Sequence, residues 1–395
     1  MALLNFAKRT SQRIRPFLAT FRNRSLPVAR LEGRAGESPG TVLFADRKPA
    51  ARALALPTFT GETQLQPLPP KFLWNLAAFA EKSETADLSI FHVDALASRH
   101  FFPPDFLRVP DTVAVFLPTP DHVEALWRAN SSLKDDMRLV RRAAMEMRVE
   151  GAEADIEGFY RNYYLPFVNT RHGELSQPRE EAWLRGRLRD GASLLWVVRD
   201  GEKIAGAIAD PIGEMLHLWV IGTRDGDPGL LKAGAVSAVY RFVIEFAQQQ
   251  RCTTINFGLC QANMNDGVLR YKRKWGAEMR QNTDNSGFFL VHWRTWNHTV
   301  AAFLAANPIV HLQDDKLRVV TATGTPGVAG PEDLKRILQR IQMPGIDGYS
   351  IVNPDGWSPD VAAPPAVRLF DGTPGVCSLI EPISLPESAY PPRKS

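Results

Sequence analysis

The most regular pattern of apolar and polar positions lies between residues 193 and 293. Short apolar runs predict strands over 193–199, 203–210 and 214–221, and Asp200-Gly201 between the first two is a strong signal for a two-residue hairpin. Apolar residues then recur at helical spacing over 230–250, before a strand at 253–257, a short cationic helix around Lys272, and strands at 277–281 and 287–293. The pattern therefore predicts an α/β unit whose first three strands form an antiparallel meander.

The chain before this region is less regular. Helical spacing over 72–82 and 122–130, and apolar runs over 88–93 and 112–117, predict a smaller α/β unit. Residues 32–70 are rich in Gly, Pro and Thr and show no sustained period, so we expect a linker there with at most one short strand.

The pattern of apolar and polar positions is also less regular after residue 295. A strand at 317–321, a helix at 331–342 that begins with Pro331, and a strand at 349–352 predict a small accessory module over 299–353. Nine of the 42 residues from Pro354 onward are proline, which predicts an extended tail over 354–395.

The distribution of charge changes this picture at the N-terminus. The net charge of +4 over 395 residues does not indicate a nucleic-acid binder. Residues 1–31, however, contain no Asp or Glu and seven basic residues interleaved with apolar ones: Lys8, Arg9, Arg13, Arg15, Arg22, Arg24 and Arg30. This basic leader fits peripheral contact with an anionic membrane surface, an organelle presequence or a solvated segment, and the sequence leaves all three open.

The cysteines and the absent motifs limit the chemistry. Cys252, Cys260 and Cys377 are odd in number and not spaced as C-x-x-C pairs, so we expect a reducing, cytoplasmic environment and no cysteine metal site. The sequence holds no Walker loop, H-E-x-x-H motif, nucleophile elbow or dinucleotide fingerprint, and nothing in it indicates DNA binding. We therefore expect no metal cofactor.

The most informative segment joins a strand to the cationic helix. The strand ends in Gly258, a polar loop with Asn263 and Asp266 follows, and the helix ends at Gly276, a residue that favours helix C-caps. Because ligands in α/β sheets bind at strand ends, this lysine-rich turn is a candidate site.

Three ordered segments carry a resemblance to a known family. Tyr271-Lys272-Arg273-Lys274-Trp275-Gly276 resembles the late motif of the FemAB-like acyltransferases of the GNAT superfamily, and the basic segment 133–143 and the segment 159–173 are similar to earlier parts of those enzymes. The resemblance spans residues 131–293. It implies a GNAT-like mixed sheet that splays where the acyl donor enters, with a degenerate first half over 71–132 and an acyltransferase core over 133–298.

The resemblance also implies transfer of an acyl group to an amine. That chemistry needs a deprotonated nucleophile, an oxyanion stabiliser and an orienting surface. Lys272 takes the family's role of holding the acceptor or stabilising the oxyanion, against the alternative of an ordinary surface lysine. Glu214 and Asp266 are candidate general bases, and His217 is either a third candidate or a core histidine.

Several further residues are candidates for binding the substrates. Arg270 and Lys274, with Arg141, would clamp a phosphate-bearing group, although solvated charge also explains each of them. Tyr163 and Tyr164 would line the acceptor groove or belong to the core. Asn263 in the polar loop is a candidate contact with the substrate.

The acyl donor is less well defined. Enzymes of the superfamily that use coenzyme A bind its pyrophosphate with a glycine-rich loop, and Arg224 and Gly226 lie at the matching place, but Asp227 stands where that loop has glycine. We expect an N-acyltransferase that moves an acyl group from acyl-coenzyme A to an amine of a cell-envelope or polysaccharide precursor. Aminoacyl-tRNA as donor, disfavoured by the balance of 47 basic and 43 acidic residues, and a catalytically silent scaffold remain the alternatives.

Overall fold

The computed structural model describes residues 24–47, 49–128, 130–152, 154–172, 178–285, 287–372 and 374–380. The chain forms two compact units, one containing the residues up to Val113 together with Gln261–Asp266 and the residues from Gln281 onward, the other containing Ala114–Cys260 and Gly267–Arg280. Each unit has a mixed sheet with helices, so the predicted α/β class is confirmed. In the described part of the chain, no helix is long and apolar enough to cross a membrane.

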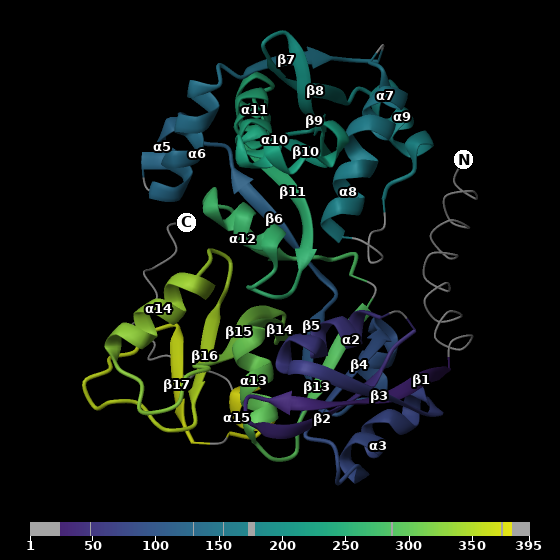
Figure 1. Ribbon diagram of the computed structural model, residues 1–395, viewed down its shortest axis with the longest axis vertical. Coiled ribbons are helices and arrows are strands. Elements are labelled where there is room, and N and C mark those ends of the chain that lie inside the picture. Colours follow the sequence, from purple (N-terminus) through teal and green to yellow (C-terminus); the bar gives the residue numbers. More distant parts are fainter. Residues whose placement is uncertain are drawn as a thin grey trace, which may run out of the picture. The chain divides into compact units, whose positions relative to one another are not determined.

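The first unit is built on a ten-stranded sheet in the order β17-β16-β15-β14-β5-β13-β4-β2-β1-β3. Its strands are β1 (Ser25–Ala35), β2 (Ser38–Ala45), β3 (Thr60–Phe72), β4 (Leu88–Asp94), β5 (Leu107–Pro110), β13 (Gly287–His292), β14 (Ile309–Gln313), β15 (Lys316–Ala322), β16 (Gly348–Asn353) and β17 (Val367–Asp371). Segments from both ends of the chain, purple and yellow in Figure 1, thus share one sheet. Its principal helices are α2 (Ala50–Ala55), α3 (Leu76–Lys82), α4 (Ala95–His100), α13 (His298–Ala306), α14 (Pro331–Ile341) and α15 (Val376–Ile380).

The predicted linker over residues 32–70 is wrong. This segment forms the end of β1, all of β2 and α2, and most of β3. Among the described strands β3 pairs with β1 alone, and it is exposed along most of its length, so it shows no alternation of apolar residues. The leader's residues 1–23 lie outside the described residues, whereas Ser25 already begins a strand.

The predicted accessory module and tail need a similar correction. β15, α14 and β16 form close to where they were expected, but they extend the ten-stranded sheet instead of standing apart. β17 lies inside the predicted tail and pairs in parallel with β16. Periodicity identifies a strand but not its partner, which explains the first error, whereas β17 is a short strand inside a segment whose proline content predicted extended chain. Residues 381–395 lie outside the described residues.

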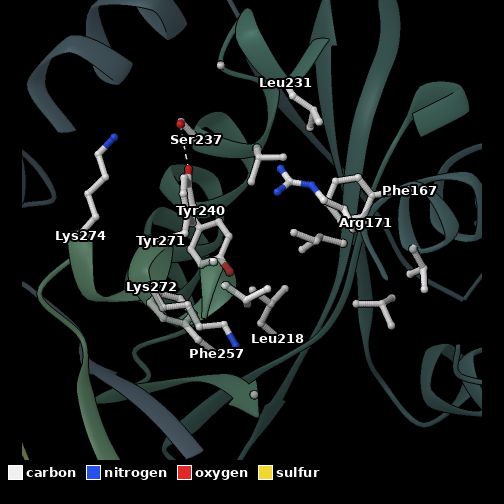
Figure 2. A pocket seen from close by; sticks show the side chains of 18 of the residues that line it. Phe167, Arg171, Leu218, Leu231, Ser237, Tyr240, Phe257, Tyr271, Lys272 and Lys274 are labelled. Carbon is white, nitrogen blue, oxygen red and sulfur yellow. Dashed lines mark hydrogen bonds between the residues drawn. The ribbon is translucent and has the colours of Figure 1, made fainter. Parts of the chain in front are cut away.

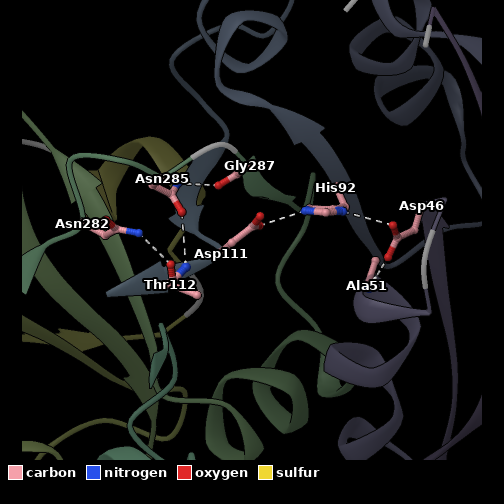
Figure 3. Close-up of polar contacts among 8 residues, drawn as sticks. All are labelled: Asp46, Ala51, His92, Asp111, Thr112, Asn282, Asn285 and Gly287. Atoms are coloured by element: carbon pink, nitrogen blue, oxygen red, sulfur yellow. Dashed lines mark hydrogen bonds and ion pairs between the residues drawn. The ribbon is translucent and has the colours of Figure 1, made fainter. Parts of the chain in front are cut away.

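A histidine held by two carboxylates joins three segments of the first unit. His92 of β4 lies with Nδ1 3.1 Å from Oδ1 of Asp46 and Nε2 2.8 Å from Oδ1 of Asp111 (Figure 3). Asp46 also accepts a hydrogen bond of 2.6 Å from the amide of Ala51 in α2, and the ring of Phe289 stacks on the imidazole at 4.8 Å. The group therefore fixes α2 and the residue after β5 to the central strand β4.

The second unit has a seven-stranded sheet in the order β12-β6-β11-β10-β9-β8-β7. Its strands are β6 (Thr112–Pro118), β7 (Glu146–Glu150), β8 (Ser193–Arg199), β9 (Glu202–Ile212), β10 (Met215–Thr223), β11 (Thr254–Gln261) and β12 (Glu278–Gln281). Strands β8, β9 and β10 form the predicted antiparallel meander, and β10 pairs in parallel with β11. The helices that matter below are α6 (Ser131–Arg142), α8 (Leu165–His172), α9 (Glu181–Arg189), α10 (Pro228–Lys232), α11 (Ala235–Gln249) and α12 (Gly267–Lys274). The long apolar helix α11 packs against β8, β9 and β10 (Figure 1).

Two strands belong to a different sheet from the one expected. β6, predicted as part of a first half over 71–132, lies between β12 and β11 in the seven-stranded sheet. β13, predicted as the last strand of the core over 133–298, lies between β5 and β4 in the ten-stranded sheet. The predicted division at residue 132 therefore does not match the two units.

Candidate functional site

The parallel strands β10 and β11 separate partway along their length. They pair only from Met215 to His217 and from Thr254 to Asn256, although both strands continue beyond. Gly258 follows with φ +78°, and its amide donates to Oδ1 of Asn256 at 2.8 Å. A positive φ suits glycine, so this residue allows β11 to turn away from β10. The splay implied by the family resemblance is therefore present.

A cavity of about 430 Å³ opens where the two strands separate (Figure 2). Its size is that of an ordinary small-molecule site. The lining comes from β10, β11 and helices α6, α8, α10, α11 and α12, and includes Asp136, Tyr164, Phe167, Arg171, Leu218, Trp219, Lys232, Gly234, Ser237, Tyr240, Phe257, Leu259, Tyr271, Lys272 and Lys274. Most of these side chains are apolar or aromatic, so the few charged groups determine which ligand fits.

Lys272 is the most unusual of the charged residues. Only 4% of it is exposed, and its Nζ donates to the carbonyl of Leu259 at 3.2 Å. Within the described ranges no carboxylate forms an ion pair with it. Trp275, three residues further along the chain, is fully buried and anchors α12. Gly276 follows with φ +77° and ends the helix. A buried ammonium without a carboxylate is costly, so a functional reason for keeping it is expected.

Lys274 has a carboxylate partner instead. Its Nζ lies 2.6 Å from Oδ2 of Asp136, which also accepts a hydrogen bond of 2.8 Å from Oγ of Ser237. The hydroxyl of Tyr271 lies 2.8 Å from the same Oγ, so this hydroxyl donates to Ser237. Burial raises the pKa of Tyr271, and the charge of Asp136 raises it further. The tyrosine therefore remains protonated, and the charge of Lys274 is already neutralised.

Tyr240 of α11 brings a second buried hydroxyl to the cavity. Only 3% of the residue is exposed, and its ring packs edge-on against Phe257 and Tyr271 at 5.0 and 5.1 Å. Its hydroxyl has no hydrogen-bond partner among the described residues, and Figure 2 shows it pointing into the cavity. Burial raises the pKa of Tyr240 well above the usual value, so this group can donate a hydrogen bond to a ligand.

Two more cations make the cavity positive. Arg171 of α8 and Lys232 of α10 both line it, and neither forms an ion pair within the part of the chain that the structure describes. The guanidinium of Arg171 lies 5.5 Å from the ring centre of Phe167. Asp136 is the one carboxylate among the described lining residues, and Lys274 already neutralises it. The cavity therefore favours a ligand with a negative or strongly electron-rich group.

The structure brings some of the predicted substrate residues to the cavity and leaves others outside. Lys274 and Tyr164 line it, although the hydroxyl of Tyr164 accepts a hydrogen bond from the amide of Arg179 at 2.8 Å. Tyr163 does not line it, because its hydroxyl donates to the carbonyl of Lys203 at 3.0 Å. The remaining two predicted cations, Arg141 and Arg270, are exposed and are absent from the lining.

The predicted bases are not among the residues that line the cavity. Glu214 is exposed in the turn before β10, at the paired end of the strands, and its carbonyl accepts from the amide of Thr253 at 2.8 Å. Asp266 and Asn263 belong to the first unit. The side-chain amide of Asn263 donates to Asn307 at 3.0 Å, which fixes the loop. Their placement gives no support to a role in this cavity.

His217 is also poorly suited to act as a base. Burial lowers its pKa, and the charge of Asp210 offsets this only partly. Since Oδ1 of Asn256 accepts from Gly258, the amide nitrogen of Asn256 faces Nδ1 of His217, 3.4 Å away. Nδ1 is then the acceptor and Nε2 carries the proton. The ring stacks on Trp219 at 5.1 Å.

The predicted pyrophosphate loop is explained by packing. Arg224 forms an ion pair of 2.9 Å with Glu202. Gly226 has φ +64°, and a Cβ there would lie 2.8 Å from the carbonyl oxygen of Pro166. Neither residue is part of the described lining, so their placement gives no support to a cofactor role.

Among the polar and charged lining residues, Asp136, Arg171, Lys232, Ser237 and Tyr240 were given no role from the sequence. Asp136 and Arg171 lie inside segments 133–143 and 159–173, which carried the family resemblance, so a signal was available for them. Lys232, Ser237 and Tyr240 lie in or next to an apolar helical pattern that predicts burial and nothing more.

Comparison with known proteins finds only distant structural similarity. The chain matches no protein-family model and no curated protein sequence. Similar solved structures include L-PGS from Bacillus licheniformis, at 11% identity over 68% of this chain and 81% of that one, with a TM-score of 0.33. FemX is 13% identical over 67% of this chain and 84% of its own, with a TM-score of 0.34. A putative acetyltransferase of the GNAT family from Novosphingobium aromaticivorans is 13% identical over 63% and 82%, with a TM-score of 0.28.

These identities and TM-scores are too low to transfer an activity. The strand order of the second unit and the separation of β10 from β11 agree with the mixed, splayed sheet that the family resemblance implied.

Proposed function

We propose that this protein transfers an acyl group to an amine in the cavity between β10 and β11. The observation that carries the proposal is the buried ammonium of Lys272, which has no carboxylate partner among the described residues and faces a cavity of small-molecule size. Attack of an amine on an acyl carbonyl places negative charge on the carbonyl oxygen. Lys272 and the hydroxyl of Tyr240 would stabilise that oxyanion as preorganised donors.

The reaction balances without a redox partner. The amine lone pair forms the new C–N bond, the C–S bond of a thioester breaks, and the departing thiolate takes up the proton that the nitrogen loses. Tyr240 remains protonated throughout, because burial raises its pKa. The proposed donor is acyl-coenzyme A, and Arg171 and Lys232 would attract its phosphates or those of an anionic envelope or polysaccharide precursor.

The amine must reach the carbonyl uncharged. Asp136, the one carboxylate among the described lining residues, already accepts from Lys274 and Ser237, so no free carboxylate on the lining serves as base. The acceptor therefore enters as the neutral amine or gives its proton to water. A rate that rises with pH toward the pKa of the acceptor amine follows from this arrangement.

An aminoacyl ester is the second candidate donor. It is favoured by one observation, namely that Arg224 and Gly226 of the expected pyrophosphate loop are absent from the described lining. The same pair of donors would serve, with a C–O bond breaking in place of C–S. A silent scaffold is less well supported, because it gives no reason to retain a buried ammonium.

The test combines binding with turnover. Calorimetric titration of coenzyme A and a series of acyl-coenzyme A thioesters is expected to show binding that is weaker for an Arg171→Ala, Lys232→Ala double variant. Thiol release with a panel of primary amines then reports transfer. Binding without release for any amine would argue against the reaction, whereas no thioester binding together with transfer from an aminoacyl ester would replace the donor and keep the site.

A further inference from the structure

Apolar side chains remain exposed at the mouth of the cavity between β10 and β11. The large apolar residues that are exposed in the described part of the second unit are Leu139, Val149, Ile212 and Leu259, and the first and last of them line the cavity. Leu139 of α6 is 38% exposed and Leu259 of β11 is 47% exposed. An isolated exposed leucine needs no explanation, but two on one cavity form an apolar surface that a ligand would cover.

The exposed leucine of β11 lies beside the groups that would stabilise the oxyanion. Nζ of Lys272 donates to the carbonyl of Leu259 itself, at 3.2 Å. Two residues earlier, Phe257 is 3% exposed and packs its ring edge-on against that of Tyr240, with 5.0 Å between the centres. Both proposed oxyanion donors therefore contact the segment 257–259. An acyl group held by these donors would have the apolar side chains of this segment next to it.

Further apolar lining comes from three helices. Leu231 of α10, Val236 of α11 and Val268 of α12 line the cavity and are half-buried. A Cβ at Gly234 would lie 3.5 Å from Cβ of Leu139, so the start of α11 approaches this leucine closely. An alkyl chain on such a surface gains about three- to fourfold in affinity for each methylene that it buries.

The charges of the cavity disfavour an acyl group that carries its own ammonium. Asp136 is the one carboxylate among the described lining residues, and it already forms an ion pair with Lys274 at 2.6 Å. The ammonium of Lys272 would repel a protonated amino group placed beside the reacting carbonyl. An uncharged hydrocarbon meets neither difficulty. The lining therefore favours a plain alkyl chain over an aminoacyl group.

We propose that the transferred acyl group is a medium- or long-chain fatty acyl group, whose hydrocarbon covers Leu139 and Leu259. This inference rests on the proposed acyl transfer and specifies its donor as a fatty acyl thioester. The bonds are those given above: the amine nitrogen forms the C–N bond, the C–S bond breaks, and the departing thiolate takes up the proton. All residues that carry the inference belong to the second unit.

The experiment measures affinity against chain length. The full chain is titrated calorimetrically with coenzyme A and with its acetyl, butanoyl, hexanoyl, octanoyl and decanoyl thioesters. We expect each added methylene to tighten binding by about three- to fourfold until the apolar lining is covered. Equal affinity for the acetyl and the octanoyl thioester would overturn the inference, whereas acyl transfer itself would stand if an amine still released thiol.

Two double variants test whether the leucines contact the chain. Leu139→Ser, Leu259→Ser should bind the decanoyl thioester about tenfold less tightly and the acetyl thioester with a smaller loss. Val149→Ser, Ile212→Ser is the matched control and should bind both normally, because those side chains are 44% and 46% exposed and are absent from the lining. Equal loss for the two thioesters, or the same loss in the control, would contradict the inference.

Titrations with alkylamines identify the source of the chain. If no thioester binds but decylamine binds more tightly than butylamine, the chain belongs to the acceptor, and the assignment to the acyl group is overturned. If thioester affinity rises with chain length but no amine releases thiol, the alkyl site is supported and the proposed transfer is not.

Discussion

The Nζ atom of Lys274 lies 2.6 Å from Oδ2 of Asp136, and this ion pair joins α12 to α6. The same carboxylate accepts from Ser237 of α11, so a lysine of the motif that carried the family resemblance serves first to hold helices together. The two side chains are 17% and 22% exposed, so water screens the pair only in part.

Replacing Lys274 by methionine should therefore lower stability. The change leaves the carboxylate of Asp136 without its cation, and a loss of about 1–3 kcal/mol in the free energy of unfolding is expected. Urea denaturation measures it. A double-mutant cycle with Asp136→Asn should recover part of the loss, and additive effects of the two changes would show that the ion pair does not stabilise the fold.

Replacing Lys272 by methionine should reduce turnover and leave stability intact. The buried ammonium has no carboxylate partner among the described residues, so an apolar side chain of similar length should leave the unfolding free energy unchanged or raise it by about 1 kcal/mol. Turnover should fall by about 10²–10³-fold, as expected for loss of one oxyanion donor. The measurements are thermal unfolding and kcat, and unchanged turnover would remove Lys272 from the mechanism.

Two tyrosines allow a matched comparison of function with stability. Tyr240→Phe removes a hydroxyl that has no protein partner in the described part of the chain, so stability should be unaffected while kcat falls about tenfold or more. Tyr271→Phe removes the hydrogen bond to Ser237 and should cost about 1 kcal/mol of stability. Equal effects of the two substitutions on kcat would contradict the assignment of Tyr240 as the donor.

The loop once expected to bind pyrophosphate should respond as a packing element. Gly226→Ala places a Cβ 2.8 Å from the carbonyl oxygen of Pro166 in a backbone with φ +64°, so a loss of about 2 kcal/mol or more in stability is expected. Arg224→Ala breaks only the pair with Glu202 and should leave both stability and coenzyme A affinity nearly unchanged. A large drop in affinity for Arg224→Ala, measured by calorimetry, would restore the loop as a donor site.

His92 should make stability depend on pH. Burial by itself lowers the pKa of this histidine, but hydrogen bonds and charges from Asp111 and Asp46 outweigh it and raise the pKa to about 9. The folded-state pKa then exceeds the unfolded value of about 6.5, so the stabilisation is fully present below pH ~6.5 and is lost as pH rises to about 9.

The expected loss between these limits is on the order of 3 kcal/mol. Urea denaturation from pH 6 to about 9.5 measures it. His92→Gln should remove most of this dependence and be less stable than the wild type at pH 6. A wild type with the same pH profile as His92→Gln would show that the imidazole is not charged in the folded chain.

Sequence reasoning located the elements of the second unit better than their partners. The hairpin at Asp200-Gly201, the meander and the long helix are local features, and the structure has all of them. Gly234, with φ +91°, separates α10 from α11, where one continuous helix from residue 230 was expected. The positions of β6 and β13 depend on pairing between distant segments, which no local pattern encodes.

For the candidate site, too, the sequence predicted which segment contributes but not which distant residues meet there. Lys272 and Lys274 both line the cavity. They could be predicted because the motif identifies the helix that follows the end of the strand. The difference in role between the two lysines could not be predicted. It depends on Asp136, which lies far from both in sequence and forms an ion pair with Lys274 but not with Lys272. Tyr240 was missed for a related reason, since a tyrosine in an apolar helix pattern has the appearance of a core residue.

The placement of β6 also bears on how the chain is made. Val113, Val115 and Leu117 of this strand are almost fully buried in the finished protein, but two of the strands beside them in the order of the sheet, β11 and β12, end only at Gln261 and Gln281. At a synthesis rate of about 5–20 residues per second, roughly 10–30 s pass between the emergence of β6 and of β12. During that time an apolar strand without its neighbours is open to aggregation, so we expect the nascent chain to depend on a chaperone until the sheet that holds the cavity is complete.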